Sequence, residues 1–372
     1  MISKIKNFVK HKKYWILVSI TYLSLIYSTS LQYAYGKERT IDLAFFVWEE
    51  KVLEEHYSDL GSLKEQQIDY NWRNFWKLSS FAWDCGYYLL QSQDIGIAIP
   101  PYKYRILPPL IVKTISSIVK ISVEMSFVLM NIIVVFLAAI FFNIFLLKDL
   151  KLSRLLSFVG GILFVSSVSV TRTLPFPMLD PISMFFSILI FISVIRKNPY
   201  LFLFSAIAGV MSKEILVIAA LMWFIETLQF RDKTKLLTNI AICLIPLLVF
   251  ISIRIGFGGS AFEVEYGHNI FKGEFPALWK RLTNFDGIFY IVRMVFLSFS
   301  FLWLGLVNVG KTNFFKRHII IVPIVILAPV LLSARITRPL GILFPIVIPL
   351  FLMFFEEYSK KGNSNIKTKI LE

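Results

Sequence analysis

The chain has 372 residues, of which 56% are hydrophobic and 16% are aromatic. A water-soluble domain would have roughly 45–50% apolar residues, so this composition excludes an ordinary soluble protein and indicates a polytopic membrane protein. The net charge of +15 does not indicate nucleic-acid binding, because the basic residues are dispersed between apolar segments. Cys85 and Cys243 are far apart, and Cys243 lies in an apolar run, so neither a disulfide nor a cysteine metal site is expected.

The N-terminus is basic and leads directly into an apolar stretch. Five lysines precede Tyr14, and no small-residue cleavage site is clear in the segment that follows. We therefore expect an uncleaved first span rather than a removable signal peptide.

The rest of the chain predicts an all-α fold of about ten transmembrane helices. The apolar stretches are residues 14–31, 125–147, 153–171, 181–195, 199–212, 215–229, 236–254, 286–308, 318–334 and 340–355. Residues 199–229 are divided into two short spans, because a single helix would place Lys213 and Glu214 in the middle of the membrane, where charge is costly.

Basic residues set the predicted orientation. When the N-terminus is placed in the cytoplasm, every short cytoplasmic segment carries at least two lysines or arginines, as the positive-inside rule requires. We therefore predict a multi-pass protein of the cell (inner or plasma) membrane, a single membrane domain over residues 1–372 with both termini cytoplasmic. Its large outer regions are residues 32–124 and 255–285, and residues 357–372 form a short, mobile cytoplasmic tail.

The first outer loop is expected to lie against the membrane. It contains four of the eight tryptophans, a residue that prefers the headgroup region. Residues 107–121 have the spacing of an amphipathic helix that begins at Pro108 and Pro109, with lysines on its polar side. Such a helix suits the membrane interface, and residues 41–55 have a similar pattern.

The same loop contains the main catalytic candidate, Asp84, within the sequence Trp83–Tyr88. Gly86 permits close approach of a ligand, and Tyr87 and Tyr88 offer ring faces and hydroxyls that suit sugars. A carboxylate here can act as a general base towards a hydroxyl acceptor. The alternative is that Asp84 caps a helix that begins just after it.

Several cations lie on the outer side, where the orientation rule does not require them. They are Arg105, Arg172, Lys213, Arg254, Arg335 and Arg338, with Arg293 about two turns inside a span. Singly, each suits snorkelling to lipid phosphates or pairing with loop acids. As a group, and with Arg335 and Arg338 so close together, they favour a pocket for a phosphate or diphosphate headgroup, which arginine binds in a bidentate way.

Two further motifs contain carboxylates. Asp180 precedes Pro181 at the start of a span, which suits a helix N-cap but also brings a second catalytic carboxylate to the outer surface. Lys213 and Glu214 suit a tight polar turn between helices, or a pair of substrate contacts at a cavity wall.

Metal and nucleotide sites are not predicted. No two of the four histidines have ligand spacing, and Gly256–Gly259 does not match a phosphate-binding loop. An outer-face transferase without a nucleotide site needs a donor carried across the membrane, such as a polyprenyl-phosphate-linked sugar. A carboxylate would then take the acceptor proton or bind a divalent cation, so the sequence is compatible with an enzyme that uses a divalent cation and with one that does not.

These motifs, in their order along the chain, resemble the C-type glycosyltransferase superfamily (the GT-C fold), whose members use lipid-phosphate-linked sugars in the cell envelope. The matching stretches are Trp83–Tyr88, Tyr104–Pro109, Asp180-Pro181, Ser212–Glu214 and Arg335–Arg338. The resemblance implies that Asp84 is the catalytic base and that Arg335 or Arg338 contacts the donor phosphate. The acceptor would be a glycan, lipid or protein.

One departure from that family concerns the position of Asp84. It lies well beyond the end of the first span near Leu31, whereas the aspartate of many relatives follows that span closely. Asp42 and Asp94 are therefore alternative bases. Other functions compatible with the sequence are a transporter or flippase of lipid-linked saccharides, a polysaccharide polymerase or ligase, and a non-catalytic scaffold. The few charges inside spans disfavour transport.

Overall fold

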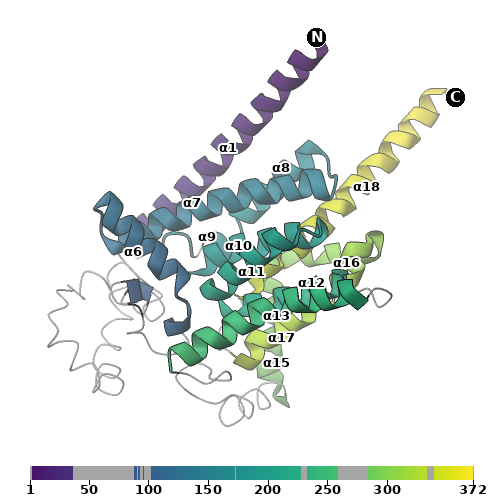
Figure 1. The fold of residues 1–372 in the computed structure, drawn as a ribbon. Coiled ribbons are helices and arrows are strands. Elements are labelled where there is room, and N and C mark those ends of the chain that lie inside the picture. Colours follow the sequence, from purple (N-terminus) through teal and green to yellow (C-terminus); the bar gives the residue numbers. More distant parts are fainter. Residues whose placement is uncertain are drawn as a thin grey trace.

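A computed structural model describes residues 2–36, 88–89, 91–92, 95, 102–171, 173–227, 233–258, 283–332 and 339–371 (Figure 1). Within these ranges the regular structure is helical, and no strand is present. The elements up to the central helix α10 are α1 (Ile2–Gly36), η2 (Tyr102–Tyr104), α6 (Leu107–Val119), α7 (Val123–Ile144), η3 (Phe145–Asp149), α8 (Arg154–Val165), α9 (Val168–Thr171) and α10 (Asp180–Ile195).

The second half of the chain continues the helical bundle. Its elements are α11 (Pro199–Ser212), η4 (Glu214–Ile218), α12 (Ala219–Thr227), α13 (Lys233–Gly256), α15 (Phe285–Phe299), η7 (Ser300–Lys311), α16 (Asn313–His318), α17 (Ile321–Leu332), η8 (Pro339–Leu343) and α18 (Phe344–Leu371). The ends of α1 and α18 that carry the two termini project from the same end of the bundle (Figure 1). We call this the terminal end.

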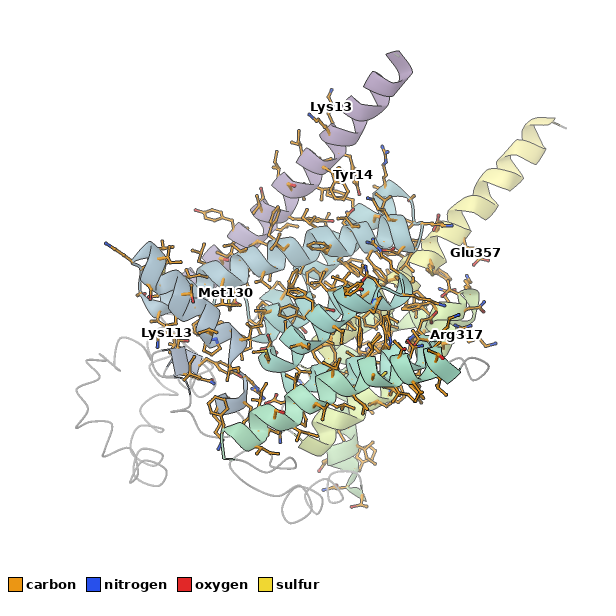
Figure 2. The ribbon with its side chains drawn as sticks, viewed as in Figure 1. Lys13, Tyr14, Lys113, Met130, Arg317 and Glu357 are labelled. Carbon is orange, nitrogen blue, oxygen red and sulfur yellow. The ribbon has the colours of Figure 1, made fainter. Side chains whose placement is uncertain are left out.

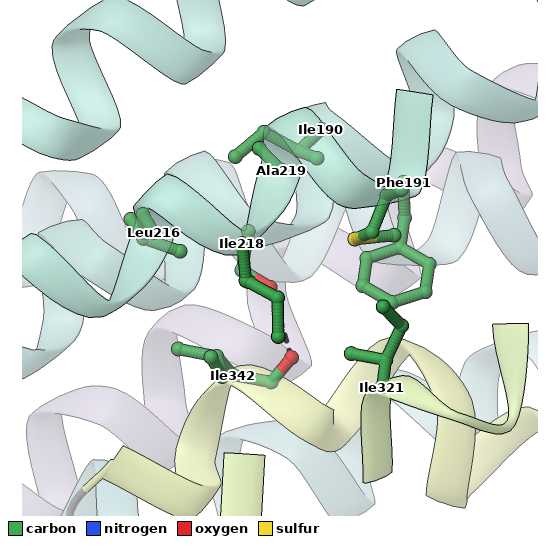
Figure 3. Close-up of a pocket in the computed structure, with 9 residues that line it drawn as sticks. Ile190, Phe191, Leu216, Ile218, Ala219, Ile321 and Ile342 are labelled. Atoms are coloured by element: carbon green, nitrogen blue, oxygen red, sulfur yellow. Dashed lines mark hydrogen bonds between the residues drawn. The ribbon is translucent and has the colours of Figure 1, made fainter. Parts of the chain in front are cut away.

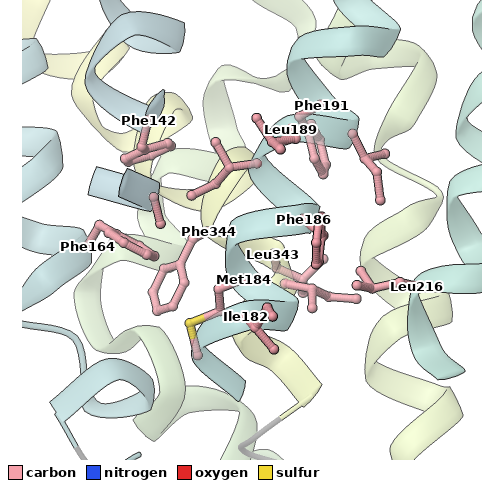
Figure 4. Packing of buried hydrophobic residues seen from close by; sticks show 14 of the residues in the cluster. Phe142, Phe164, Ile182, Met184, Phe186, Leu189, Phe191, Leu216, Leu343 and Phe344 are labelled. Carbon is pink, nitrogen blue, oxygen red and sulfur yellow. The ribbon is translucent and has the colours of Figure 1, made fainter. Parts of the chain in front are cut away.

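Helix α10 forms the centre of the bundle. Fourteen of its sixteen residues are buried, and it packs against α7, α11, α12, α18 and η8. Figure 4 shows Ile182, Met184, Phe186 and Leu189 of this helix among side chains from several neighbouring elements. A helix that is apolar on all sides is typical of a buried position. Apolar residues occur on all sides of α10, which explains why it is buried.

Close packing between α1, α7 and α8 depends on a small residue and a buried amide. Asn143 of α7 donates to the Tyr22 hydroxyl at 2.9 Å and accepts from the Tyr14 hydroxyl at 3.0 Å, so one side chain joins two turns of α1. Tyr22 also donates to the Phe158 carbonyl at 3.2 Å. A Cβ atom at Gly161 would overlap the Tyr22 ring. Small residues permit such contacts between membrane helices.

Three of the described helical segments are long and apolar enough to cross a membrane, namely Met125–Asp149, Thr234–Gly256 and Leu340–Glu357. Four more apolar helices are shorter: Leu107–Val119, Arg154–Val165, Asp180–Ile195 and Pro199–Ser212. Two stretches predicted as single spans are interrupted. Residues 153–171 divide into α8 and α9, and residues 286–308 divide at Ser300, whose φ is +48°.

Other boundaries agree with the sequence patterns. Helix α6 begins at Leu107, with the predicted prolines in its first turn, and its C-cap residue Lys120 is left-handed. Val112 of α6 is buried, whereas Ile118 is 75% exposed and apolar, as a helix bordering lipid would be. Helix α18 continues to Leu371, so the predicted mobile tail is helical over most of its length.

We predict that Gly305→Ala destabilises the bundle. A Cβ atom at this glycine of η7 would lie 2.7 Å from the Phe351 Cα and 2.8 Å from the Leu350 carbonyl carbon, and the α18 backbone cannot move aside locally. Overpacking of this kind costs about 1–3 kcal/mol, which is measurable as a lower melting temperature in detergent. Gly310→Ala in the same element is the control, because its Cβ would meet nothing within 4 Å. Equal melting temperatures for the two variants would contradict the close approach.

Candidate functional site

The α11–η4 junction places two opposite charges side by side at the end of the bundle opposite the terminal end. Helix α11 stops at Ser212 because Lys213 adopts an extended conformation (φ −160°, ψ 128°), and η4 begins at Glu214. Successive residues of an extended segment point in opposite directions. Lys213 and Glu214 therefore reach different partners, one on α10 and the other beside η2.

Lys213 forms a buried ion pair with Asp180. Its Nζ atom lies 2.6 Å from Asp180 Oδ1, and the aspartate side chain is 1% exposed. The segment that leads into α10 is itself buried, and Asn131 of α7 secures it by donating to the Phe176 carbonyl at 2.7 Å. The predicted capping role of Asp180 is wrong, because Leu179 occupies the N-cap position and Asp180 is the first helical residue.

Glu214 holds the side chain of Arg105. The Nε atom of Arg105 lies 3.0 and 2.9 Å from the two carboxylate oxygens of Glu214, and its Nη1 atom donates to the Tyr88 hydroxyl. The guanidinium carbon also lies 5.5 Å from the centre of the Tyr102 ring. Such a site combines ion pairing with cation–π attraction, for which arginine is well suited.

These contacts stabilise the charged form of Arg105. Burial alone would lower its pKa, but the Glu214 carboxylate, followed by the Tyr88 and Tyr102 side chains, outweighs burial and raises the pKa of Arg105 above its ordinary range. The side chain is still 15% exposed, and among the described residues no partner is found for its Nη2 atom. A fixed guanidinium with an uncommitted donor can bind an oxyanion.

Arg254 of α13 extends the same group. Its guanidinium carbon lies 5.0 Å from the centre of the Tyr104 ring, and Tyr104 directly precedes Arg105. Gln91 secures this segment by donating to the Lys103 carbonyl at 3.0 Å. Side-chain contacts, together with the chain neighbours Lys213 and Glu214, and Tyr104 and Arg105, thus link Asp180 to Arg254. We call Asp180, Lys213, Glu214, Arg105 and Arg254, with Tyr88, Tyr102 and Tyr104, the charged network.

The structure brings together five of the residues that the sequence predicted for the site: Asp180, Tyr88, Arg105, Lys213 and Glu214. The other predicted residues, Asp84, Tyr87, Arg335 and Arg338, lie outside the described residues, as do the alternative bases Asp42 and Asp94. Sequence reasoning missed the ring contacts of Tyr102 and Tyr104. Their position immediately before Arg105, between prolines, was the available signal.

Cavities lie among the described residues, away from the charged network. One apolar cavity of about 10 Å³ lies between α10, η4, α12, α17 and η8. Figure 3 shows residues that line it, such as Ile190, Leu216 and Ile342. This volume is roughly that of one water molecule, so it is a packing defect rather than a substrate site. A second cavity is a larger groove at the terminal end, between α7, α10 and α11.

Each end of α10 carries its own ion pair. About 24 Å from Asp180, given the rise of an α-helix, the C-cap residue Arg196 pairs with Asp149. Figure 2 shows Lys13, Arg317 and Glu357 towards the terminal end and Lys113 at the other end. Within the described ranges, no cluster of three histidine, cysteine or acidic side chains could hold a metal ion.

Comparisons with known proteins identify no relative: no family model, curated protein or solved structure matches the chain. The case for a function therefore depends on the residues themselves.

We predict that Lys213→Met strongly destabilises the protein. Removing one partner of a buried ion pair costs about 3–5 kcal/mol, whereas replacing both partners by neutral groups costs less. The double variant Asp180→Asn, Lys213→Met should therefore recover part of the loss, as measured by unfolding in mixed micelles.

The control for this cycle is Lys197→Met at the terminal end. Lys197 is 55% exposed and lies 3.5 Å from Glu226, so its loss should cost about 0–1 kcal/mol. A Lys213→Met variant no less stable than the control would show that the Asp180 pair does not support the fold.

Proposed function

We propose that the protein is a membrane glycosyltransferase, which transfers a sugar from a lipid-phosphate-linked donor to an acceptor on the outer face of the cell membrane. The observation that supports this proposal is the charged network. It presents arginine, carboxylate and tyrosine side chains together at one end of an apolar helical bundle, on the side where a lipid headgroup would lie. The finer arrangement that we propose has about ten spans, a GT-C fold and both termini in the cytoplasm.

Chain connectivity links the network to the proposed catalytic residue. Asp84 precedes Tyr88 by four residues, which an extended chain spans in at most about 14 Å. Arg338 directly precedes Pro339, the first residue of η8, and η8 is joined to α10 where Ser187 donates to the Ile342 carbonyl at 2.9 Å. The motifs that resemble the glycosyltransferase family are thus attached to elements that meet in the bundle.

The proposed chemistry uses one carboxylate and several cations. Asp84 takes the proton of the acceptor hydroxyl as the acceptor oxygen bonds to the anomeric carbon of the donor. The bond between that carbon and the phosphate oxygen breaks, and the electron pair remains on the lipid phosphate. Arg105, Arg335 and Arg338 stabilise the phosphate that leaves, while Tyr87 and Tyr88 contact the sugar. Asp180, which the sequence suggested as a second catalytic carboxylate, instead holds Lys213 in place in this proposal.

We predict that Asp84→Asn abolishes transfer while the protein still folds. The amide keeps the shape of the side chain but cannot accept the proton, and loss of general base catalysis lowers rates by about 10²–10⁴-fold. Transfer from a labelled polyprenyl-phosphate sugar in proteoliposomes measures this effect. Asp286→Asn, which alters an exposed aspartate in the first turn of α15, is the matched control. Normal turnover in the Asp84→Asn enzyme would contradict the assignment of Asp84 as the base and would leave Asp42 and Asp94 as the candidates.

We predict that Arg335→Ala and Arg338→Ala each weaken binding of polyprenyl phosphate, because each removes a charged donor to the phosphate. A charge-assisted hydrogen bond contributes about 1.5–3 kcal/mol, so the dissociation constant should rise by at least tenfold. Arg317→Ala is the control, since Arg317 is 52% exposed and lies at the terminal end, away from the charged network. Unchanged affinity in both variants would refute the phosphate role.

The transport alternative gives a different result in sealed vesicles. A flippase moves the intact lipid-linked sugar between leaflets and releases no free lipid phosphate. A glycosyltransferase releases lipid phosphate in step with the glycosylated product, and a polymerase or ligase transfers a long glycan rather than one sugar.

A further inference from the structure

A groove at the terminal end lies on the opposite side of the bundle from the charged network. It has a volume of about 690 Å³ and is bounded by α7, α10 and α11. Its walls are apolar, and they include Phe141 of α7, Phe185, Leu189 and Ile192 of α10, and Phe204 of α11. Ligand pockets typically measure about 300–1,000 Å³, so the groove is large enough for a sizeable apolar group.

Charged side chains close one end of this groove. Arg196 and Asp149 form a bidentate pair there, with Nε–Oδ1 and Nη2–Oδ2 distances of 2.8 and 2.9 Å. Lys148 stands beside the pair, and among the described residues it has no acidic partner. The Asp149 carboxylate compensates one of the two cations, so the mouth of the groove keeps a positive charge.

The backbone at this mouth has an unusual conformation. The last turn of α7 widens into the π-helix η3, where Leu150 donates to the Phe145 carbonyl at 3.1 Å, and the chain then reverses at Lys151, whose φ is +58°. The π-turn carries Lys148 and Asp149. Such turns occur frequently at functional sites. Here the turn presents both side chains to the end of α10 and to the groove.

We propose that this groove binds one anionic phospholipid of the cytoplasmic leaflet. One acyl chain lies along the aromatic and aliphatic walls, and the phosphate meets Lys148 and Arg196 at the mouth. An apolar groove whose mouth keeps one excess positive charge matches a lipid with an anionic headgroup, and basic pockets between membrane helices on the cytoplasmic side bind such headgroups. This site is separate from the proposed catalytic one. The proposal requires only that the terminal end faces the cytoplasm, as the basic residues predict.

Binding of defined lipids to the purified full-length protein tests this proposal. The probes are phosphatidylglycerol and phosphatidylcholine with identical acyl chains, and lipid retention is measured by native mass spectrometry. We expect one phosphatidylglycerol molecule to be retained at a lipid concentration that leaves no bound phosphatidylcholine. Lys148→Gln should weaken phosphatidylglycerol binding by about fivefold, the effect of one basic residue near an anionic lipid. Phe204→Trp should also weaken it, by narrowing the groove.

Matched controls keep the outcome interpretable. Lys316→Gln removes an exposed charge elsewhere at the terminal end, and Leu155→Trp enlarges an exposed apolar side chain on α8, so neither should change retention. Glycerol 3-phosphate, which has a phosphate but no acyl chain, should not bind. Equal retention of the two lipids would mean ordinary lipid contact only and would overturn the proposal. So would equal losses in the controls, or binding of glycerol 3-phosphate as tight as that of the lipid.

Discussion

The break between α11 and η4 is the constraint on which the arrangement of the charged network depends. At Lys213 the chain leaves the helical conformation, and two adjacent side chains of opposite charge turn away from each other. One reaches the first residue of the central helix and the other reaches the arginine that precedes α6. In a continuous α-helix, consecutive side chains are only about 100° apart around the helix axis. Two neighbouring residues could then not point in opposite directions, one towards α10 and the other towards Arg105. The break between α11 and η4 therefore holds three separate parts of the chain together: α10, the junction itself and the segment that precedes α6.

The two ion pairs of the charged network have different roles. Because taking charges out of water is costly, a buried pair such as Asp180 and Lys213 contributes modest net stability, whereas removing one partner leaves an unpaired buried charge and is destabilising. Arg105 differs from that pair because it is partly exposed and because its Nη2 atom has no partner within the part of the chain that the structure describes. One pair thus stabilises the arrangement of helices, while the other presents a fixed cation at the surface. That division suits a site that must receive an anionic headgroup without rearranging.

Sequence patterns predicted some of these features and could not predict others. The helical periodicity and prolines of residues 107–121 were sufficient for α6, because both are local properties. The hydropathy pattern predicted one continuous span for residues 153–171 and another for residues 286–308, but both are interrupted. Hydropathy does not detect backbone breaks such as the one at Ser300. The charge cost at Lys213 correctly indicated an interruption there. The partner of Asp180 could not be read from the sequence, since Lys213 follows it by 33 residues and the local motif favoured a helix cap.

The most direct test of the account is a structure of the protein with polyprenyl phosphate bound, determined in a lipid nanodisc. The measured quantity is the distance from the phosphate oxygens to the Arg105 guanidinium. The account predicts hydrogen-bond contact, about 2.7–2.9 Å for a charge-assisted pair, with the lipid chain leaving towards the bilayer. Phosphate density at the opposite end of α10, beside Lys148 and Arg196, with none near Arg105, would contradict the assignment of the charged network as the donor site.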